Sequence, residues 1–184
     1  MKPGEIIILT GKIQSGKTNF CLDLAQNAKD MGINLAGVLS PGVFHQDEKT
    51  GIDVVNLKSW ERRRLAVLRG IGQIGIETRR WSFYPEIVDW GNQVLKNAVP
   101  CDLLIVDELG PLEFEREEGW IAGISAVDSG EYQTALVVIR PSFLKMANQR
   151  WKVSRVHDLD NTQNTSCSSE DILARLIVEG NKSN

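Results

Sequence analysis

The segment that most constrains the fold of this chain is the glycine-bounded run GKIQSGKT at residues 11–18. It fits the pattern G-x-x-x-x-G-K-[ST], it follows an apolar strand-like run at residues 5–10, and a helical pattern begins at Lys17. Glycine at both ends lets the backbone curl so that successive N–H groups point inward, and a helix N-terminus adds positive potential. A strand, a glycine turn and a helix in this order predict a P-loop that binds the phosphates of a nucleotide.

The side chains of this turn have expected roles. Lys17 would reach the β- and γ-phosphates, and Thr18 would be a ligand of Mg²⁺. The remaining residues would contribute mainly backbone N–H groups. The candidate nucleotide-binding residues are Gly11, Lys12, Ile13, Gln14, Ser15, Gly16, Lys17, Thr18 and Asn19.

A second apolar run, at residues 103–106, is followed by two acids, Asp107 and Glu108. Open α/β sheets collect their ligands at the carboxyl ends of their strands, so these acids are expected to face the P-loop. Asp107 would support Mg²⁺, and Glu108 would orient or deprotonate the attacking water. Glu113 is an alternative base, and Arg140, which ends a further apolar strand, is a candidate cation for the charge of the transition state.

Apolar runs alternate with segments of helical periodicity, which predicts an α/β fold with a largely parallel sheet. At 184 residues the chain fits a single domain spanning residues 1–184. Two runs too close together for a crossover helix, residues 52–57 and 65–68, predict an antiparallel hairpin inserted into this fold. The other strands are expected at residues 5–10, 33–39, 103–106 and 135–139, the helices at 17–31, 85–98, 120–127, 141–149 and 170–179, and a surface loop at 158–169.

Composition narrows the possible partners. The net charge of −3 argues against a broad nucleic-acid footprint or an anionic-membrane footprint, because both require an excess of basic residues. No apolar run approaches the roughly 18 residues of a membrane span, and the three cysteines have no disulfide or zinc-site spacing. We therefore expect a cytoplasmic protein whose partner is a nucleoside triphosphate such as ATP or GTP.

The motifs together resemble the THEP1-like nucleoside-triphosphatases, a P-loop family. The resemblance rests on the P-loop, on Asp107-Glu108-Leu109-Gly110 followed by Glu113, and on the segments AGVLSP (36–41), GIDVVNL (51–57) and FYPE (83–86). It implies a three-layer α/β/α fold and magnesium-dependent hydrolysis of several nucleoside triphosphates. Carried over by position, it assigns phosphate and magnesium binding to Lys17 and Thr18, magnesium support to Asp107 and water activation to Glu108.

Two other functions would use the same phosphate-binding P-loop. A small-molecule or nucleotide kinase would bind an acceptor and exclude water, and the chain lacks an arginine-rich lid motif of that kind. A nucleotide-operated switch would hydrolyse slowly and time the binding of a partner. Release of phosphate without an acceptor distinguishes hydrolysis from a kinase, and rapid turnover by a monomer counts against a switch.

Overall fold

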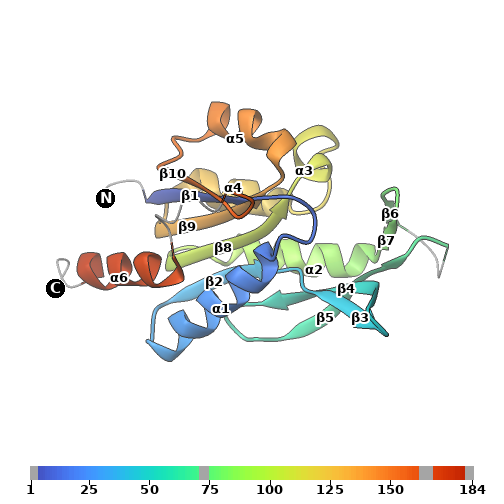
Figure 1. The fold of residues 1–184 in the computed structure, drawn as a ribbon, viewed down its shortest axis with the longest axis horizontal. Coiled ribbons are helices and arrows are strands. Elements are labelled where there is room, and N and C mark those ends of the chain that lie inside the picture. The colour runs from blue at the N-terminus through green and yellow to red at the C-terminus, as the bar shows by residue number, and fades with distance from the viewer. Residues whose placement is uncertain (1–3, 71–74, 162–167, 181–184) are drawn as a thin grey trace.

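The computed structural model describes residues 4–70, 75–161 and 168–180, and it forms one ten-stranded sheet flanked by helices (Figure 1). The strands are β1 (Glu5–Thr10), β2 (Leu35–Leu39), β3 (Gly42–His45), β4 (Glu48–Asn56), β5 (Arg62–Leu68), β6 (Ile76–Glu77), β7 (Trp81–Phe83), β8 (Cys101–Leu109), β9 (Tyr132–Ile139) and β10 (Arg155–Asp158). The helices are α1 (Lys17–Asp30), α2 (Pro85–Lys96), α3 (Pro111–Glu115), α4 (Ile121–Ser129), the 3-10 turn η1 (Pro141–Phe143), α5 (Leu144–Arg150) and α6 (Ser169–Gly180).

The sheet has a parallel half and an antiparallel half. Its strand order is β10-β1-β9-β8-β2-β4-β5-β7-β6, with β3 paired to β4. From β10 to β2 every pairing is parallel, whereas β4 pairs antiparallel to β2 and each later pairing is antiparallel. The carboxyl ends of the parallel strands therefore meet at one edge, which is where a strand-turn-helix phosphate site must open.

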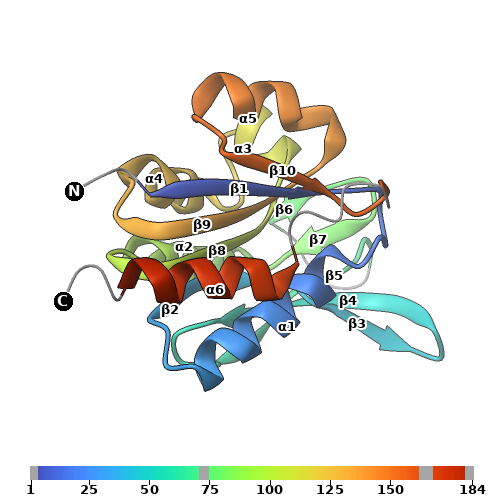
Figure 2. The same cartoon turned by 60° about the vertical axis from the view of Figure 1, so that its left-hand side comes forward.

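Alternating side chains of the central strands serve two separate cores. In β1, Ile6 and Ile8 belong to the core beneath α2 and α4, whereas Ile7 and Leu9 belong to the core beneath α1 and α6. Figures 1 and 2 show α1 and α6 next to each other on one face of the sheet. A strand covered on both faces reads as a continuous apolar run, which explains the sequence of β1. The expected α/β architecture of three layers is confirmed.

The structure differs from the sequence-based expectations at several elements. The antiparallel hairpin is present as β4 and β5, but it is extended by the short strands β3, β6 and β7. β10 was not predicted, and Asp158, expected to begin a loop, ends this strand instead; residues 162–167 of that loop lie outside the described residues. β10 is an edge strand of mixed polar composition, RVHD, so it lacks the apolar run on which the predictions relied.

The described residues include no helix that combines the length and the apolar character needed to cross a membrane. Cys21 and Cys101 are buried free thiols, and Cys167 lies outside the described residues. Ser168 caps the final helix α6: its hydroxyl accepts the Asp171 N–H at 3.1 Å, while its N–H donates to the Asp171 carboxylate at 3.0 Å.

Gly37→Ala should destabilise the parallel half of the sheet. Gly37 has φ +115°, and a Cβ there would lie 1.9 Å from the carbonyl oxygen of Ile105 on β8. We expect a loss in the free energy of unfolding on the order of 3 kcal/mol or more, measured by urea denaturation. Gly32→Ala is the matched control, because Gly32 also has positive φ (+71°) but no atom within 4 Å of its Cβ position. Equal losses in the two variants would show that the contact with Ile105 is unimportant.

Candidate functional site

The P-loop adopts the conformation that its glycines allow. Gly11 has φ +145°, Gln14 has φ +65°, and Gly16 has φ +91° as the residue that caps α1. A Cβ at Gly11 would lie 2.6 Å from the Ser15 hydroxyl oxygen, so a side chain there would obstruct the curl of the loop. The turn delivers the chain directly into the 14-residue helix α1, whose N-terminus carries partial positive charge. This is a concave arrangement suited to phosphate oxygens.

Lys17 lies folded over the loop that precedes it. Its ammonium group donates to the carbonyl oxygens of Gly11 at 2.8 Å and Lys12 at 2.6 Å, and to the Ser15 hydroxyl at 3.3 Å. The Lys12 backbone N–H donates to the carboxylate of Asp160 at 2.6 Å, so the segment after β10 contacts the P-loop and stabilises it. The cation is thereby held within the curl of the P-loop.

Four of the other P-loop residues expose their side chains to solvent. Ile13 is 82% exposed at the tip of the loop, and Lys12, Gln14 and Asn19 are also exposed. Their side chains do not enter the curl, so any contact of these residues with phosphate would come from the backbone.

Asp107 lies near the carboxyl end of β8 in a buried position, facing the helix that begins at Lys17. One strand, β9, lies between β1 and β8, so the two strands are about 10 Å apart, a gap that a polyphosphate and its metal can span. Asp107 is only 1% exposed; it accepts the Ser40 N–H at 2.9 Å, and the Thr18 side chain lies close enough to lower the pKa of its carboxyl group. The structure thus brings Lys17, Thr18 and Asp107 together.

The electrostatic setting of Asp107 is unfavourable for a bare carboxylate. Burial raises its pKa to about 6, and the nearby charge of Glu108 adds to the increase. The Ser40 N–H bond, the Thr18 side chain and the positive charge of Lys17 oppose this effect. A carboxylate in this position gains stability when a cation binds next to it.

Glu108 lies in a β-bulge of β8. Val106 is in register with Val137 of β9, but Leu109 is in register with Ile139, so β8 has one extra residue in this interval. The bulge changes the side-chain alternation, because Leu109 then packs in the same core as Val106. Glu108 adopts φ +64° and remains 42% exposed at the rim. Bulges of this kind re-aim side chains next to active sites.

Arg140 contacts Glu108 directly. It follows β9, which is parallel to β1, so it lies at the same edge of the sheet as the P-loop. Its Nε donates to Glu108 Oε1 at 2.7 Å, and its terminal nitrogen forms an ion pair with the same oxygen. The guanidinium group therefore orients the carboxylate and balances its charge.

The carboxylate of Glu113, the alternative base, accepts hydrogen bonds from the backbone. It is buried, and its two oxygens accept the N–H groups of Gly110 and Trp120, both at 2.8 Å. Burial raises the pKa of Glu113, although these two hydrogen bonds oppose the increase. Through these two bonds the carboxylate links the N-terminus of α3 to the N-terminus of α4. This arrangement favours a structural role for Glu113 over contact with the attacking water.

The oxygen donors of this site fit Mg²⁺. Thr18 supplies a hydroxyl and Asp107 a carboxylate, and hard oxygen ligands of this kind are the ones that Mg²⁺ prefers. No cluster of three or more His, Cys, Asp or Glu residues that could hold a metal occurs in the described part of the chain.

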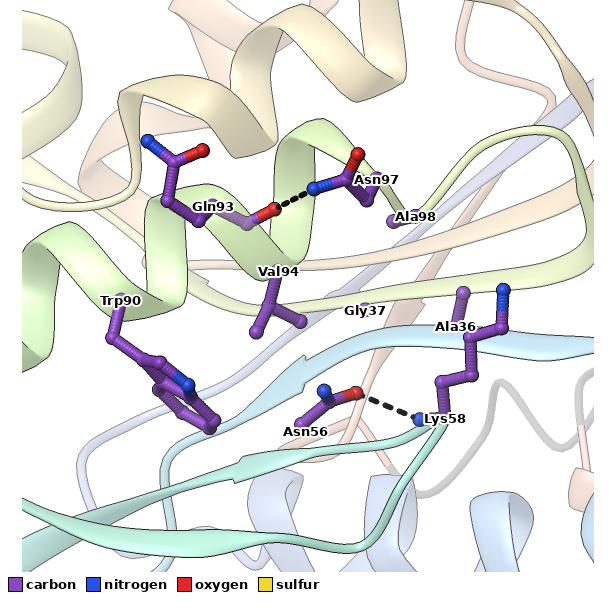
Figure 3. Close-up of a pocket in the computed structure, with 9 residues that line it drawn as sticks. All are labelled: Ala36, Gly37, Asn56, Lys58, Trp90, Gln93, Val94, Asn97 and Ala98. Carbon is purple, nitrogen blue, oxygen red and sulfur yellow. Dashed lines mark hydrogen bonds between the residues drawn. The ribbon is translucent and has the colours of Figure 1, made fainter.

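A separate cavity of about 270 Å³ lies between α2 and the strands β2 and β4 (Figure 3). It is lined by three carboxamides, Asn56, Gln93 and Asn97, and by Lys58 and Trp90, together with smaller residues. It opens on the face of the sheet covered by α2, whereas α1 and the P-loop lie on the other face. This cavity is not part of the phosphate site.

Sequence reasoning missed three residues at the site. Ser40 reaches Asp107 through its backbone N–H, and Asp160 reaches the P-loop from the segment after β10. Lys49, on the antiparallel part of the sheet, lies close enough to Asp107 and Glu108 to interact with their charges. Ser40 lies in the segment AGVLSP, which gave it no role, and Asp160 and Lys49 belong to none of the motifs, so only tertiary contact identifies these three residues.

Known proteins are similar to this chain in sequence and in fold. The sequence pattern of the NTPase family matches residues 6–164. A nucleoside-triphosphatase THEP1 from Thermococcus kodakarensis is 27% identical over 176 residues, covering 94% of each protein. A THEP1 protein from Methanopyrus kandleri is 27% identical over 110 residues, and the match spans 59% of this chain and 59% of that relative.

A solved structure, the solution structure of a human cancer-related nucleoside triphosphatase, superposes with a TM-score of 0.67 at 18% identity. The superposition covers 98% of this chain and 100% of the human one, so the likeness extends over the whole fold. Together with the family match over residues 6–164, these findings confirm the resemblance noted from the motifs. This chain belongs to the NTPase family and is one of the THEP1-like nucleoside-triphosphatases.

Proposed function

We propose that this protein hydrolyses nucleoside triphosphates, ATP and GTP among them, in a reaction that requires Mg²⁺. The observation that supports this most directly is the meeting of Lys17 and Thr18 with the buried Asp107 at one edge of the sheet. A P-loop hydrolase site needs a phosphate-binding loop and an acidic residue near the end of another strand, and these must lie next to each other. Membership in the NTPase family supports the same reaction.

In this proposal the P-loop backbone and Lys17 bind the β- and γ-phosphates, while Thr18 and Asp107 hold the magnesium ion. When bound, the ion neutralises charge on the phosphate oxygens. Glu108 accepts a proton from the attacking water while the oxygen of that water forms a bond to the γ-phosphorus. The bond from that phosphorus to the bridging oxygen breaks, and a nucleoside diphosphate and inorganic phosphate leave. Arg140 keeps the Glu108 carboxylate at the rim and orients it.

The test is phosphate release from ATP, GTP, CTP and UTP, each with Mg²⁺ and without any acceptor. The expected result is release of inorganic phosphate from at least one nucleotide, abolished by a magnesium chelator. Absence of release from all four, with phosphorylation of an added metabolite, would replace hydrolysis by a kinase activity. If the chelator left the rate of phosphate release unchanged, the reaction would not require a metal ion.

Lys17→Ala should weaken binding of the triphosphate. The ammonium group is the only charged side chain folded into the described P-loop, and losing a charge-assisted bond costs about 1.5–3 kcal/mol, or roughly 10- to 100-fold in Kd. Fluorescent-nucleotide titration measures the change. Lys96→Ala, an exposed lysine in the last turn of α2, is the matched control. An unchanged Kd in Lys17→Ala would contradict the phosphate role of Lys17.

A further inference from the structure

The β3–β4 hairpin extends past the edge of the sheet at which the P-loop opens. β2 ends at Leu39, which pairs with Val55 of the antiparallel strand β4. The residues of β4 that precede Val55 therefore continue beyond the carboxyl end of β2, next to the end of β8 that bears Asp107. Figures 1 and 2 both show this hairpin at the end of the molecule where β1 runs into the turn before α1.

Lys49, the second residue of β4, is held by packing along its length. Its aliphatic chain crosses Gly42 of β3, where a Cβ would lie 2.7 Å from Lys49 Cε. Its ammonium nitrogen lies 5.4 Å from the centroid of the Trp81 ring, and the Arg80 guanidinium carbon lies 5.1 Å from the same centroid. Arg80 also donates to the Lys49 carbonyl at 3.4 Å. The side chain is half-buried and has a defined direction.

The charges around Lys49 are those of the site. Burial lowers the pKa of Lys49, the negative charges of Glu108 and Asp107 oppose this, and the positive charges of Arg80 and Arg140 add to it. The ammonium group therefore lies within electrostatic reach of both acids at the end of β8, although it is separated from them by about sixty residues of sequence.

Lys49 differs from the other cations of the site in its hydrogen bonds. Lys17 donates to three oxygens of its own loop, and Arg140 donates to Glu108. Over residues 4–70, 75–161 and 168–180, the Lys49 ammonium has neither a hydrogen bond nor an ion pair. A half-buried ammonium with three unused donors favours an anionic ligand that comes within its reach.

We propose that Lys49 is a catalytic cation that contacts the terminal phosphate from the side opposite the P-loop and stabilises the charge that develops during transfer to water. The assignment rests on the proposed hydrolysis. As the bond from the γ-phosphorus to the bridging oxygen breaks, charge spreads over the equatorial oxygens of the transferred group, and a fixed cation next to them lowers the barrier. Arg140 is committed to Glu108, whereas Lys49 has its donors available for these oxygens.

Lys49→Ala tests the assignment. Because the contact strengthens in the transition state, kcat for Mg-ATP should fall about 10- to 100-fold while KM changes by less than about threefold. Binding of Mg-ADP with aluminium fluoride, which mimics the transferred phosphate, should weaken by a similar factor, and binding of Mg-ADP alone should not. Lys49→Arg should recover part of the loss because it restores the charge.

Gly42→Ala is an independent test that keeps the lysine at position 49 but shifts its side chain. The added methyl group would displace Cε of the lysine and the ring edge of Phe44, both of which are movable side-chain atoms. We expect kcat to fall while the melting temperature changes little. Lys58→Ala is the control, since Lys58 is an exposed lysine just beyond the other end of β4, roughly 30 Å along the strand from Lys49.

The outcomes separate the two proposals. If wild type turns over and Lys49→Ala is equally active, the role of Lys49 is wrong and the hydrolase proposal stands. If Lys49→Ala weakens ADP and the aluminium fluoride complex by the same factor, Lys49 is a ground-state binding residue and the catalytic assignment is overturned. If wild type releases phosphate from no nucleotide, the hydrolase proposal fails, and the assignment of Lys49 fails with it.

Discussion

Glu108→Gln should leave nucleotide binding nearly intact and lower turnover by roughly 10²–10³-fold. The amide keeps an oxygen that can accept the bonds now donated by Arg140, so the position of the side chain is preserved while its capacity to take a proton is lost. Single-turnover phosphate release, measured beside the Kd of a fluorescent triphosphate, separates the chemical step from binding. Full activity in this variant would show that another group prepares the water.

Glu113→Gln is the informative comparison for Glu108→Gln. Glu113 accepts backbone N–H groups with both oxygens, so an amide would set an NH₂ group against one of these donors in a buried position. The expected loss in the free energy of unfolding is about 1–3 kcal/mol, with kcat per folded molecule changed little. The opposite pattern, a stable but inactive Glu113→Gln, would transfer the proton-accepting role from Glu108 to Glu113.

The contrast between these two glutamates shows how far local sequence can predict a site. The P-loop and the acids Asp107 and Glu108 were identified from the sequence because each pair or run is encoded within a few consecutive residues. The bulge that lifts Glu108 to the rim depends on the register between β8 and β9, and the partner of Glu113 at Trp120 lies in another loop. Those features are set by tertiary pairing, so no single segment could reveal them.

The same reason applies to the elements that were missed. β10 is short and partly polar, and it becomes a strand because β1 offers it a parallel edge in register from Ile7↔Arg155 to Thr10↔Asp158. The hairpin of β4 and β5 was predicted from its apolar runs, but the reach of Lys49 toward the site depends on where β4 pairs with β2. Sequence periodicity indicates which residues are buried and leaves open which distant segments become neighbours.

Asp107→Asn should abolish most turnover and make the nucleotide-free protein more stable at neutral pH. Raising the pKa of a carboxyl group from 3.8 to about 6 by burial corresponds to about 3 kcal/mol of unfavourable free energy in the folded state. An amide removes this charge and still accepts the Ser40 N–H. We therefore expect a gain of up to about 3 kcal/mol in the free energy of unfolding with a turnover loss of about 10²-fold or more.

The pH dependence of this gain follows from the direction of the shift. Below about pH 4, Asp107 is neutral in both the folded and the unfolded chain, so Asn has little advantage. Between about pH 4 and 6 the unfolded chain ionises first, and wild type loses stability relative to the variant. Above about pH 6 both forms are ionised and the difference is constant. Urea denaturation at pH 4, 5, 6 and 8, in the presence of a metal chelator, measures the profile.

Asp102→Asn is the matched control at the other end of β8. Asp102 is less buried and its carboxylate accepts from the Asn34 N–H at 3.0 Å and the Gln133 amide at 2.8 Å, so its replacement should give no gain in the free energy of unfolding.

The stabilising effect of magnesium and nucleotide should then distinguish wild type from Asp107→Asn. Only wild type offers a carboxylate to the cation, so ligand at about 100 times its Kd should stabilise wild type by about 2.7 kcal/mol and the variant by much less. Equal stabilisation of both proteins by Mg-ATP would contradict the magnesium role of Asp107.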